Sequence, residues 1–288
     1  MTVQNLLWLI VAGTAAIDVV LLIAQGMTVA VEWATVAGVL FLYCLSIIYR
    51  YRSAKLAAVS LLATQLVAFS YVGAILTYLA MAATSQPMAD DTLAQADAAL
   101  GFDWFSWFGF VSSHPKLKLL LALAYNSWLA QGLVLLGYQS VAEPKRAQEF
   151  LLAAMLSIIF ITPLMVLLPA VGHHIALAEP WRDDILALRN HSMRQIGAMQ
   201  GIVTFPSFHT ALGVLFPAMY RDRKWFLPVL ALNLLMIASV MTEGAHYAVD
   251  MLAGAALAFL ALAATRFMLA RCTPEGVIFQ DRLARALD

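Results

Sequence analysis

Eight apolar segments of about 20 residues follow one another along the chain, separated by more polar connections. A helix of about 20 residues spans the hydrocarbon core of a bilayer, and inside lipid it satisfies its own backbone hydrogen bonds. The pattern therefore predicts an all-α fold, a polytopic membrane bundle with about eight transmembrane helices. The predicted segments are 5–25, 28–49, 56–84, 116–140, 147–171, 206–220, 224–242 and 247–270.

The composition indicates the same class of protein. Of the 288 residues, 62% are hydrophobic and 12% are charged, whereas a soluble domain carries about 25% charged residues. The formal net charge is zero, which argues against a nucleic-acid partner. The two cysteines, Cys44 and Cys272, are too few for a disulfide framework or a cysteine-built metal site. No basic stretch precedes the first segment, so we expect that segment to be a retained spanning helix.

Basic residues gather on one side of the predicted bundle. Lys and Arg near spanning segments are enriched on the cytoplasmic side, and 12 of the 17 follow the second, fourth, sixth or eighth segment. We therefore expect an integral protein of the inner or plasma membrane with both termini in the cytoplasm. The twelve are Arg50, Arg52, Lys55, Lys145, Arg146, Arg221, Arg223, Lys224, Arg266, Arg271, Arg282 and Arg285, and the other side carries Lys116, Lys118, Arg182, Arg189 and Arg194.

The six histidines all fall at the opposite, outer side of the predicted bundle. Histidine is the side chain best suited to proton transfer near neutral pH, so this distribution predicts a reaction at the periplasmic or extracellular face. The alternative is that histidines tolerate a membrane interface without taking part in a reaction. The six are His114, His173, His174, His191, His209 and His246.

The stretch Pro206-Ser207-Phe208-His209 opens the sixth segment. Proline suits the first turn of a helix, where its missing N–H would be unpaired, so we expect this helix to begin near residues 205–206. The first-turn N–H groups and the helix dipole form an anion site, to which Ser207 adds a hydroxyl and His209 a proton donor. An ordinary helix cap beside an interfacial histidine is the alternative interpretation.

His246 and Asp250 lie four residues apart at the start of the last segment, on one helix face. A carboxylate behind an imidazole fixes its tautomer and raises its basicity, as an activated histidine requires. An acid inside a spanning helix is costly unless it is paired, which also favours this contact. Gly244 permits a tight turn and a close backbone approach just before the pair. A purely structural His–Asp bond is the alternative.

The connection 172–205 contains three arginines and no lysine: Arg182, Arg189 and Arg194. Guanidinium groups match phosphate or carboxylate oxygens bidentately and stay charged when partly desolvated. These arginines are therefore candidates for binding an anionic group. Alternatively, they pair with acidic residues of the same connection or extend along the interface.

Residues 96–110, before the fourth segment, combine Asp97 and Asp103 with Trp104, Trp107 and many apolar residues. We expect an interfacial segment on the outer surface, which either gates a site there or belongs to an aromatic belt.

Together these elements resemble the type-2 phosphatidic acid phosphatase superfamily, the membrane relatives of vanadium haloperoxidases. Its second motif, Pro-Ser-x-His, is matched by residues 206–209. In its third motif, Ser-Arg-x3-Gly-x-His-x3-Asp, the arginine position holds Val240. The matching positions of that motif are Ser239, Gly244, His246 and Asp250.

The first motif of that superfamily, Lys-x6-Arg-Pro, is missing. Arg182-x6-Arg189 is similar in spacing but is followed by Asn190. The stretches FPSFH and GAHYAVD look most like the inositolphosphotransferase-type branch, and the surrounding sequence looks like its bacterial members. That resemblance implies that Arg189 and Arg194 replace the missing cations.

The resemblance covers the chain after its first two helices and implies a division into three parts. These are two N-terminal transmembrane helices at 1–55, a six-helix phosphatase- or phosphotransferase-like membrane core at 56–271 and a cytoplasmic tail at 272–288.

The resemblance also implies a mechanism through a phospho-histidine. His246, oriented by Asp250, attacks phosphorus, and His209 first protonates the leaving alkoxide and then activates the acceptor. No metal or other cofactor is expected, because arginines and a helix N-terminus supply the positive charge. The phosphate-binding residues implied are Arg189, Arg194 and Ser207.

The expected substrate is a phosphorylated lipid of the bilayer. With water as acceptor the protein is a lipid phosphatase, and with an alcohol it is a phosphotransferase, such as an inositol-phosphate transferase that acts on a lipid or sugar alcohol.

Three other functions are weighed against this one. A lipid-binding or transport protein would carry polar groups near the membrane midplane and inverted symmetry between its halves, whereas here the polar cluster lies at one surface. A zinc site would use ligands among His173, His174, His246 and Asp250. An intramembrane serine protease would use Ser207, but no Gly-x-Ser-x-Gly context surrounds it.

Overall fold

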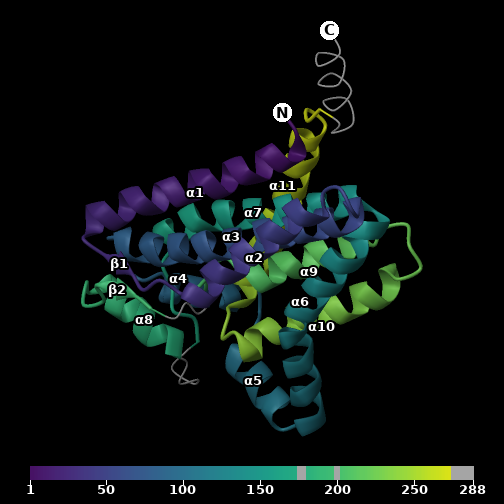
Figure 1. The fold of residues 1–288 in the computed structure, drawn as a ribbon. Coiled ribbons are helices and arrows are strands. Elements are labelled where there is room, and N and C mark those ends of the chain that lie inside the picture. The colour runs from purple at the N-terminus through teal and green to yellow at the C-terminus, as the bar shows by residue number, and fades with distance from the viewer. Residues whose placement is uncertain (174–179, 198–201, 274–288) are drawn as a thin grey trace.

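The computed structural model describes residues 1–173, 180–197 and 202–273. This part of the chain forms eleven helices and one pair of short strands, and it confirms the predicted all-α membrane bundle (Figure 1). Arg282 and Arg285 of the predicted tail lie outside the described residues. The eight apolar helices are α1 (Val3–Gln25), α2 (Trp33–Tyr49), α3 (Ala54–Ala83), α6 (Pro115–Ala142), α7 (Pro144–Leu167), α9 (Phe208–Met219), α10 (Phe226–Glu243) and α11 (Ala248–Leu269).

Six of the helices in the described ranges are long and apolar enough to cross a membrane: α1, α3, α6, α7, α10 and α11. The other two apolar helices are shorter, with 17 residues in α2 and 12 in α9. Helix α2 begins five residues later than the apolar pattern predicts, because strand β1 (Thr28–Val29) precedes it. Strand β1 pairs in parallel with β2 (Gln195–Ile196), which ties the α1–α2 connection to a distant part of the chain.

Three further helices have only nine or ten residues each: α4 (Asp90–Ala99), α5 (Trp104–Ser112) and α8 (Pro180–Arg189). The residues 96–110 are divided between α4 and α5, and Gly101, at φ 74°, lies in the turn between them. Helix α8 packs against α3, and the hydroxyl of Tyr78 in α3 donates to Asp184 in α8 at 3.3 Å. In Figure 1, α8 lies beside the two strands, and α5 projects from the bundle.

Helix α9 is short but lies at the centre of the bundle, packed against α7, α10 and α11. Its Leu215, Phe216 and Met219 are almost fully buried among these neighbours. Helix α11 approaches the start of α9 so closely that a Cβ at Gly254 would lie 2.3 Å from the carbonyl oxygen of Ser207. This close approach holds the starts of α9 and α11 together, and these two helix starts carry the two sequence motifs.

Ion pairs link several helices at one end of the bundle. They involve four of the twelve basic residues expected on the cytoplasmic side, so the structure brings these four to a common end. The ion pairs are Glu149–Arg221 at 2.9 Å, Glu149–Arg266 at 2.8 Å, Glu143–Arg146 at 2.6 Å and Glu143–Arg223 at 2.5 Å.

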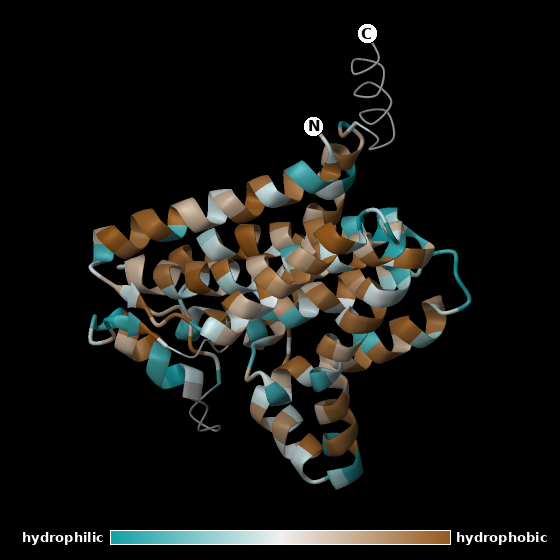
Figure 2. Ribbon diagram, in the orientation of Figure 1, coloured by the Kyte–Doolittle hydropathy of each residue, from teal (hydrophilic) through white to brown (hydrophobic). Residues whose placement is uncertain are grey.

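Figure 2 shows apolar residues along the helices and hydrophilic residues in α8 and at the connections.

Candidate active site

The first half of the site is the start of α9. Ser207 is its N-cap: the Ser207 hydroxyl accepts a hydrogen bond from the Thr210 N–H at 3.3 Å. Pro206 therefore lies before the helix, and the expected helix start at residues 205–206 is wrong by two or three residues, because a short hydroxyl side chain, not the proline, caps the first turn. The Ser207 N–H donates to the Asp250 carbonyl at 3.1 Å, a direct link to α11.

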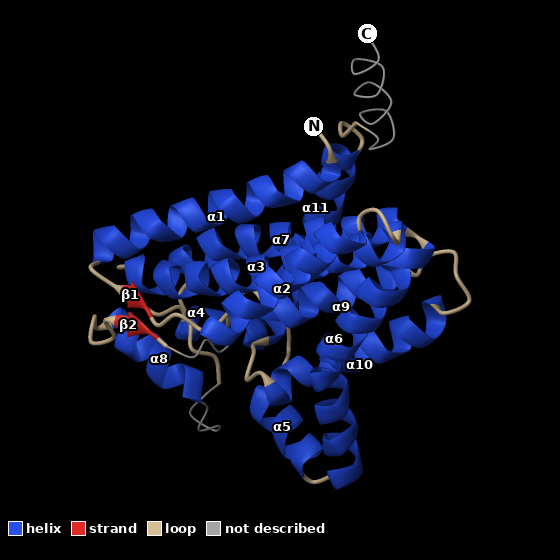
Figure 3. Cartoon of the chain, viewed as in Figure 1, coloured by secondary structure: helices blue, strands red, loops and turns tan. Residues whose placement is uncertain are grey.

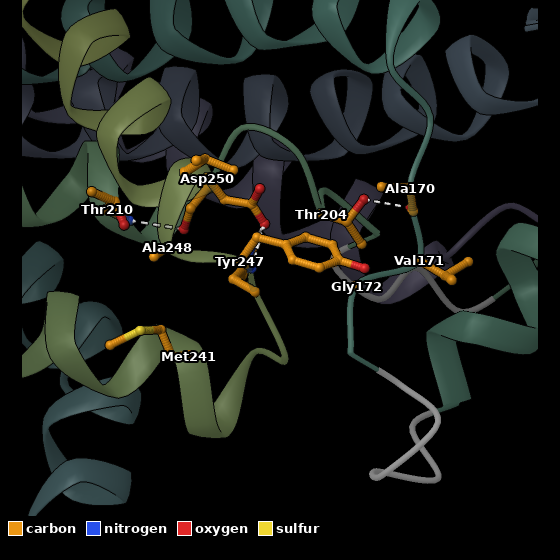
Figure 4. Close-up of polar contacts among 12 residues, drawn as sticks. Ala170, Val171, Gly172, Thr204, Thr210, Met241, Tyr247, Ala248 and Asp250 are labelled. Atoms are coloured by element: carbon orange, nitrogen blue, oxygen red, sulfur yellow. Dashed lines mark hydrogen bonds and ion pairs between the residues drawn. The ribbon is translucent and has the colours of Figure 1, made fainter. Parts of the chain in front are cut away.

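The second half of the site is the His246–Asp250 pair at the start of α11. The His246 Nδ1 lies 3.0 Å from the Asp250 Oδ2. The same Oδ2 accepts from the Tyr247 N–H at 2.9 Å (Figure 4). His246 is 4% exposed and Asp250 is fully buried. Because a carboxylate accepts, the Nδ1 carries the proton and the lone pair of the imidazole lies at Nε2. The geometry makes His246 a nucleophile or base through its Nε2.

Gly244 provides the space that this imidazole occupies. A Cβ at Gly244 would lie 2.6 Å from the His246 Cδ2 and 3.2 Å from its Nε2. Ala245, between the two, adopts φ 51°, in a region that residues with a Cβ rarely enter. The close approach expected from this glycine is therefore present, and it lies at the ring of His246 itself.

His209 lies two residues after Ser207, in the Pro-Ser-x-His motif at the start of α9. It is near enough to His246 for the two imidazoles to interact electrostatically. The His209 ring stacks on Tyr125 of α6 with 4.3 Å between ring centroids, and Trp128 meets it edge-on. Among the described residues its Nε2 has no hydrogen-bond partner, so this nitrogen is available to exchange a proton with a bound molecule.

Two of the three arginines of the connection, Arg189 and Arg194, have hydrogen bonds to other parts of the described chain. Arg189 donates to the carbonyl oxygens of Thr84 and Gln86, just after α3. Arg194 donates to the carbonyl of Gln25 at the end of α1, at 3.3 Å, and Arg182 is exposed. Between the described residues, the bonds of Arg189 and Arg194 run to backbone carbonyls, and none joins either arginine to the histidine pair.

The third motif departs from its pattern at Val240, and the structure shows what the position does. The Val240 side chain is fully buried, and its carbonyl accepts from the Gly244 N–H at 2.9 Å and the His246 N–H at 3.5 Å. Ser239 is also buried, and its hydroxyl donates to the Met236 carbonyl at 2.6 Å. Both residues therefore shape the turn before His246 and bring no charge to the site.

A scan of family models against the chain matches the PAP2 superfamily over residues 91–264, more than half of the sequence. The chain belongs to the PAP2 superfamily. Comparisons with curated proteins and with solved structures gave no match. The matched region begins in α4 and ends in α11, so it contains both halves of the site. Membership supports a function of the phosphatase or phosphotransferase type.

The other histidines of this PAP2-superfamily chain occupy different surroundings. The His173 ring stacks on Trp104 with 4.4 Å between ring centroids, and the His173 backbone N–H donates to the Ala245 carbonyl at 2.7 Å. Burial lowers the pKa of His173 to about 4, so its imidazole is neutral at pH 7. His114 bonds within its own turn, to the Phe110 carbonyl.

His174, a possible zinc ligand, lies outside the described residues. The described residues contain no group of three or more His, Cys, Asp or Glu placed to hold a metal ion.

The sequence did not identify two carboxylates of α4 as part of the site: Asp97, which is buried, and Asp90, which is half-buried. Asp97 accepts from the first two N–H groups of α11, and Asp90 accepts from the Tyr247 hydroxyl at 3.1 Å. Burial raises the pKa of Asp90, and its hydrogen-bond donors oppose that rise. The available signal was the seven-residue spacing of Asp90 and Asp97, which places both on one face of a helix.

The ring of Tyr247 lies between the start of α11 and the segment Val171–Gly172 (Figure 4). Asp90 joins these parts, since it also accepts from the N–H groups of Val171 and Gly172. The Thr204 hydroxyl donates to the Ala170 carbonyl at 2.6 Å and holds the same segment from the other side. The turn that carries His246 is thus fixed by α4 and by the chain that leads into α9.

Proposed function

We propose that this PAP2-superfamily protein transfers a phosphoryl-type group from a phosphorylated membrane lipid through a phospho-histidine at His246. The observation that carries the proposal is the His246–Asp250 pair: the carboxylate holds Nδ1 and leaves Nε2 to react, and His209 is near enough to interact with His246 electrostatically. A nucleophilic nitrogen next to a second imidazole is what a two-step transfer requires.

In the first step, the His246 Nε2 attacks phosphorus while the bond from phosphorus to the alkoxide oxygen breaks. This step requires a proton on His209, which passes to the departing oxygen. In the second step, His209 takes a proton from water or an alcohol, whose oxygen attacks phosphorus while the P–N bond breaks. His209 is then protonated again, and His246 is regenerated.

The phosphate oxygens need positive or hydrogen-bonding partners, since such a transfer relies mainly on positioning and charge neutralisation. The N-terminus of α9 supplies its helix dipole, and Ser207 supplies a hydroxyl whose hydrogen is free to donate while its oxygen caps the helix. Arg189 and Arg194 stay the predicted cations. Their roles require the guanidinium groups to bind phosphate in addition to, or instead of, the backbone carbonyls of α1 and α3.

The lipid substrate is supported by the surroundings of the site. Six helices of the described chain are long and apolar enough to cross a membrane, and Trp128, which contacts His209, is 40% exposed on the apolar surface of α6. A lipid headgroup would therefore reach His209 from the membrane–water interface. The sidedness of the basic residues supports cytoplasmic termini and a site at the outer face.

The stretches FPSFH and GAHYAVD favour the inositolphosphotransferase-type branch and a bacterial member of it. Hydrolysis and transfer to an alcohol share every step except the acceptor, so the products of the reaction distinguish them.

The experiment uses purified full-length protein in lipid vesicles with phosphatidate or phosphatidylinositol, with and without an acceptor alcohol and EDTA. Quenching in alkali preserves a phospho-histidine, which is then measured on the protein. We expect product and phospho-protein in the wild type, neither in His246→Ala, and little product in His209→Ala. His114→Ala is the matched control.

Full activity in His246→Ala would overturn the phospho-histidine. Loss of activity with EDTA would show that a metal ion is required. Lipid binding without any product would favour a lipid-binding or transport protein instead.

The arginine assignment is tested separately with Arg189→Lys and Arg194→Ala. A hydrogen bond to a charged group contributes about 1.5–3 kcal/mol, so a phosphate-binding arginine should raise KM about tenfold or more when it is replaced. Arg52→Ala, at an exposed basic residue on the other side, is the control. An unchanged KM in both variants, with only a lower melting temperature, would show that these arginines hold α1 and α3 and do not bind phosphate.

A further inference from the structure

Asp97 of α4 is a buried carboxylate placed against the start of α11. Asp97 is only 3% exposed to solvent. Its Oδ2 accepts from the Ala248 N–H at 2.8 Å, and its Oδ1 accepts from the Val249 N–H at 2.9 Å. Both oxygens of one carboxylate are thus used on the first turn of the helix that carries Asp250, although the two segments lie 151 residues apart in the chain.

The start of α11 needs an acceptor from elsewhere. The first N–H groups of a helix have no partner inside the helix and are usually satisfied by a short polar N-cap side chain. Here the N-cap is Tyr247, whose hydroxyl is directed to Asp90 instead. The carboxylate of the same turn is Asp250, and its Oδ2 already accepts from the Tyr247 N–H and from His246.

These contacts divide the hydrogen bonds of the turn between two carboxylates. Asp97 satisfies the N–H groups of Ala248 and Val249, which leaves Asp250 directed at His246. Without Asp97, two buried N–H groups would lack an acceptor, and the Asp250 carboxylate would be drawn toward them and away from the imidazole. An uncompensated buried donor is costly enough to change the preferred side-chain position nearby.

Asp90 adds a second point of attachment on the same face of α4, seven residues earlier. It holds the Tyr247 hydroxyl and the N–H groups of Val171 and Gly172. Helix α4 therefore holds the residues on the C-terminal side of His246 at two places, the Tyr247 ring and the Ala248 backbone.

We propose that Asp97 is a positioning residue that keeps the Asp250 carboxylate on His246 by satisfying the start of α11. The proposal rests on the proposed role of His246 as the nucleophile. It predicts an effect on the rate of the chemical step and not on substrate binding, because Asp97 is bonded to α11 and would act through Asp250.

The test compares Asp97→Ala, Asp97→Asn and the matched control Asp91→Asn, which removes the same charge from the exposed side of α4. Each protein is assayed in vesicles for kcat and KM, and the fraction that forms phospho-protein counts the active molecules. We expect Asp97→Ala to lower kcat per active molecule about 10–100-fold with KM nearly unchanged, as for groups that orient a functional histidine. Asp97→Asn keeps one acceptor oxygen, so it should recover part of the rate and lie a few-fold below wild type.

Wild-type kcat per active molecule in Asp97→Ala would overturn the proposal, even if less protein folds. Should that variant fail to accumulate, Asp97→Asn carries the test, and a wild-type kcat there would overturn it equally. Failure of the proposed function itself looks different, because the wild type would then form no phospho-protein or His246→Ala would stay active.

Discussion

The Nδ1 of His246, in the turn before α11, lies 3.0 Å from the Oδ2 of Asp250 in the first turn of that helix, and both side chains are almost fully buried. Because the acceptor is a carboxylate, the imidazole is held in the tautomer whose Nε2 is unprotonated. The contact therefore determines both the direction of the ring and the identity of the nitrogen that can attack.

Replacing Asp250 with Asn should abolish this control of the tautomer. An amide can donate to Nδ1, which moves the imidazole proton to Nε2 and removes the nucleophilic lone pair. We expect kcat to fall about 10²–10⁴-fold, the range typical for loss of a proton-transfer or orienting group. The measurement is steady-state turnover in vesicles, with thermal unfolding as a check on folding. A decrease of less than threefold would contradict the orienting role.

Replacing Gly244 with Ala should displace His246. The new methyl group would lie 2.6 Å from the His246 Cδ2 and 2.9 Å from the Val240 carbonyl oxygen. Neither neighbour can move without disturbing the turn, so we expect turnover to fall about tenfold or more. Gly13→Ala is the matched control, because a Cβ there meets nothing within 4 Å, and alanine favours a helix interior. Equal turnover in the two variants would contradict the prediction.

Much of the fold follows from local patterns in the sequence. Apolar runs of spanning length predict the eight apolar helices, because that pattern depends only on helix geometry. The i, i+4 spacing of His246 and Asp250 correctly predicts their contact, but not its geometry: the spacing predicts both on one helix face, whereas His246 lies in the turn before α11 and reaches Asp250 from there. The start of α9 was placed too early because proline and serine both suit a helix start. The extended backbone of Ser207, at ψ 116°, and its hydrogen bond from the Thr210 N–H identify it as the cap.

The rest of the site depends on contacts between distant segments, which spacing does not encode. Asp97 reaches Ala248 only because α4 folds back across the start of α11. Arg189 stays a predicted anion ligand, and nothing in the sequence indicated that its guanidinium also donates to the backbone carbonyls of Thr84 and Gln86. Which partner an arginine takes is decided by packing.

Replacing Glu149 with Ala should destabilise the protein and leave turnover unchanged. The Glu149 side chain is 8% exposed and joins α7 to Arg221 and Arg266, at the end of the bundle where Arg146 and Arg223 also pair. Both of its arginine partners are partly exposed, so water can solvate them once the carboxylate is gone. The free energy of unfolding should therefore decrease by about 1–3 kcal/mol, between the values for surface and buried ion pairs. Thermal unfolding in detergent measures this decrease.

Glu149→Gln controls for size and retains one acceptor oxygen, so its melting temperature should lie between those of the wild type and Glu149→Ala. A loss of turnover in properly folded Glu149→Ala would contradict the separation between this network and the site.

His173 should make the folded state sensitive to acid. Burial lowers its pKa from 6.5 to about 4, whereas the unfolded chain keeps the ordinary value. Between these two pH values the unfolded state binds a proton that the folded state excludes, so the free energy of unfolding decreases as pH falls from 6.5 to 4.

In His173→Phe the ring can still stack on Trp104, but it cannot be protonated, so the melting temperature of this variant should fall less steeply over that pH window. His114→Phe, at an exposed histidine, controls for the loss of an imidazole as such. Parallel pH profiles for the wild type and His173→Phe would mean that His173 takes up its proton equally well in the folded state, and that its stacking on Trp104 and Tyr247 does not exclude the charged form.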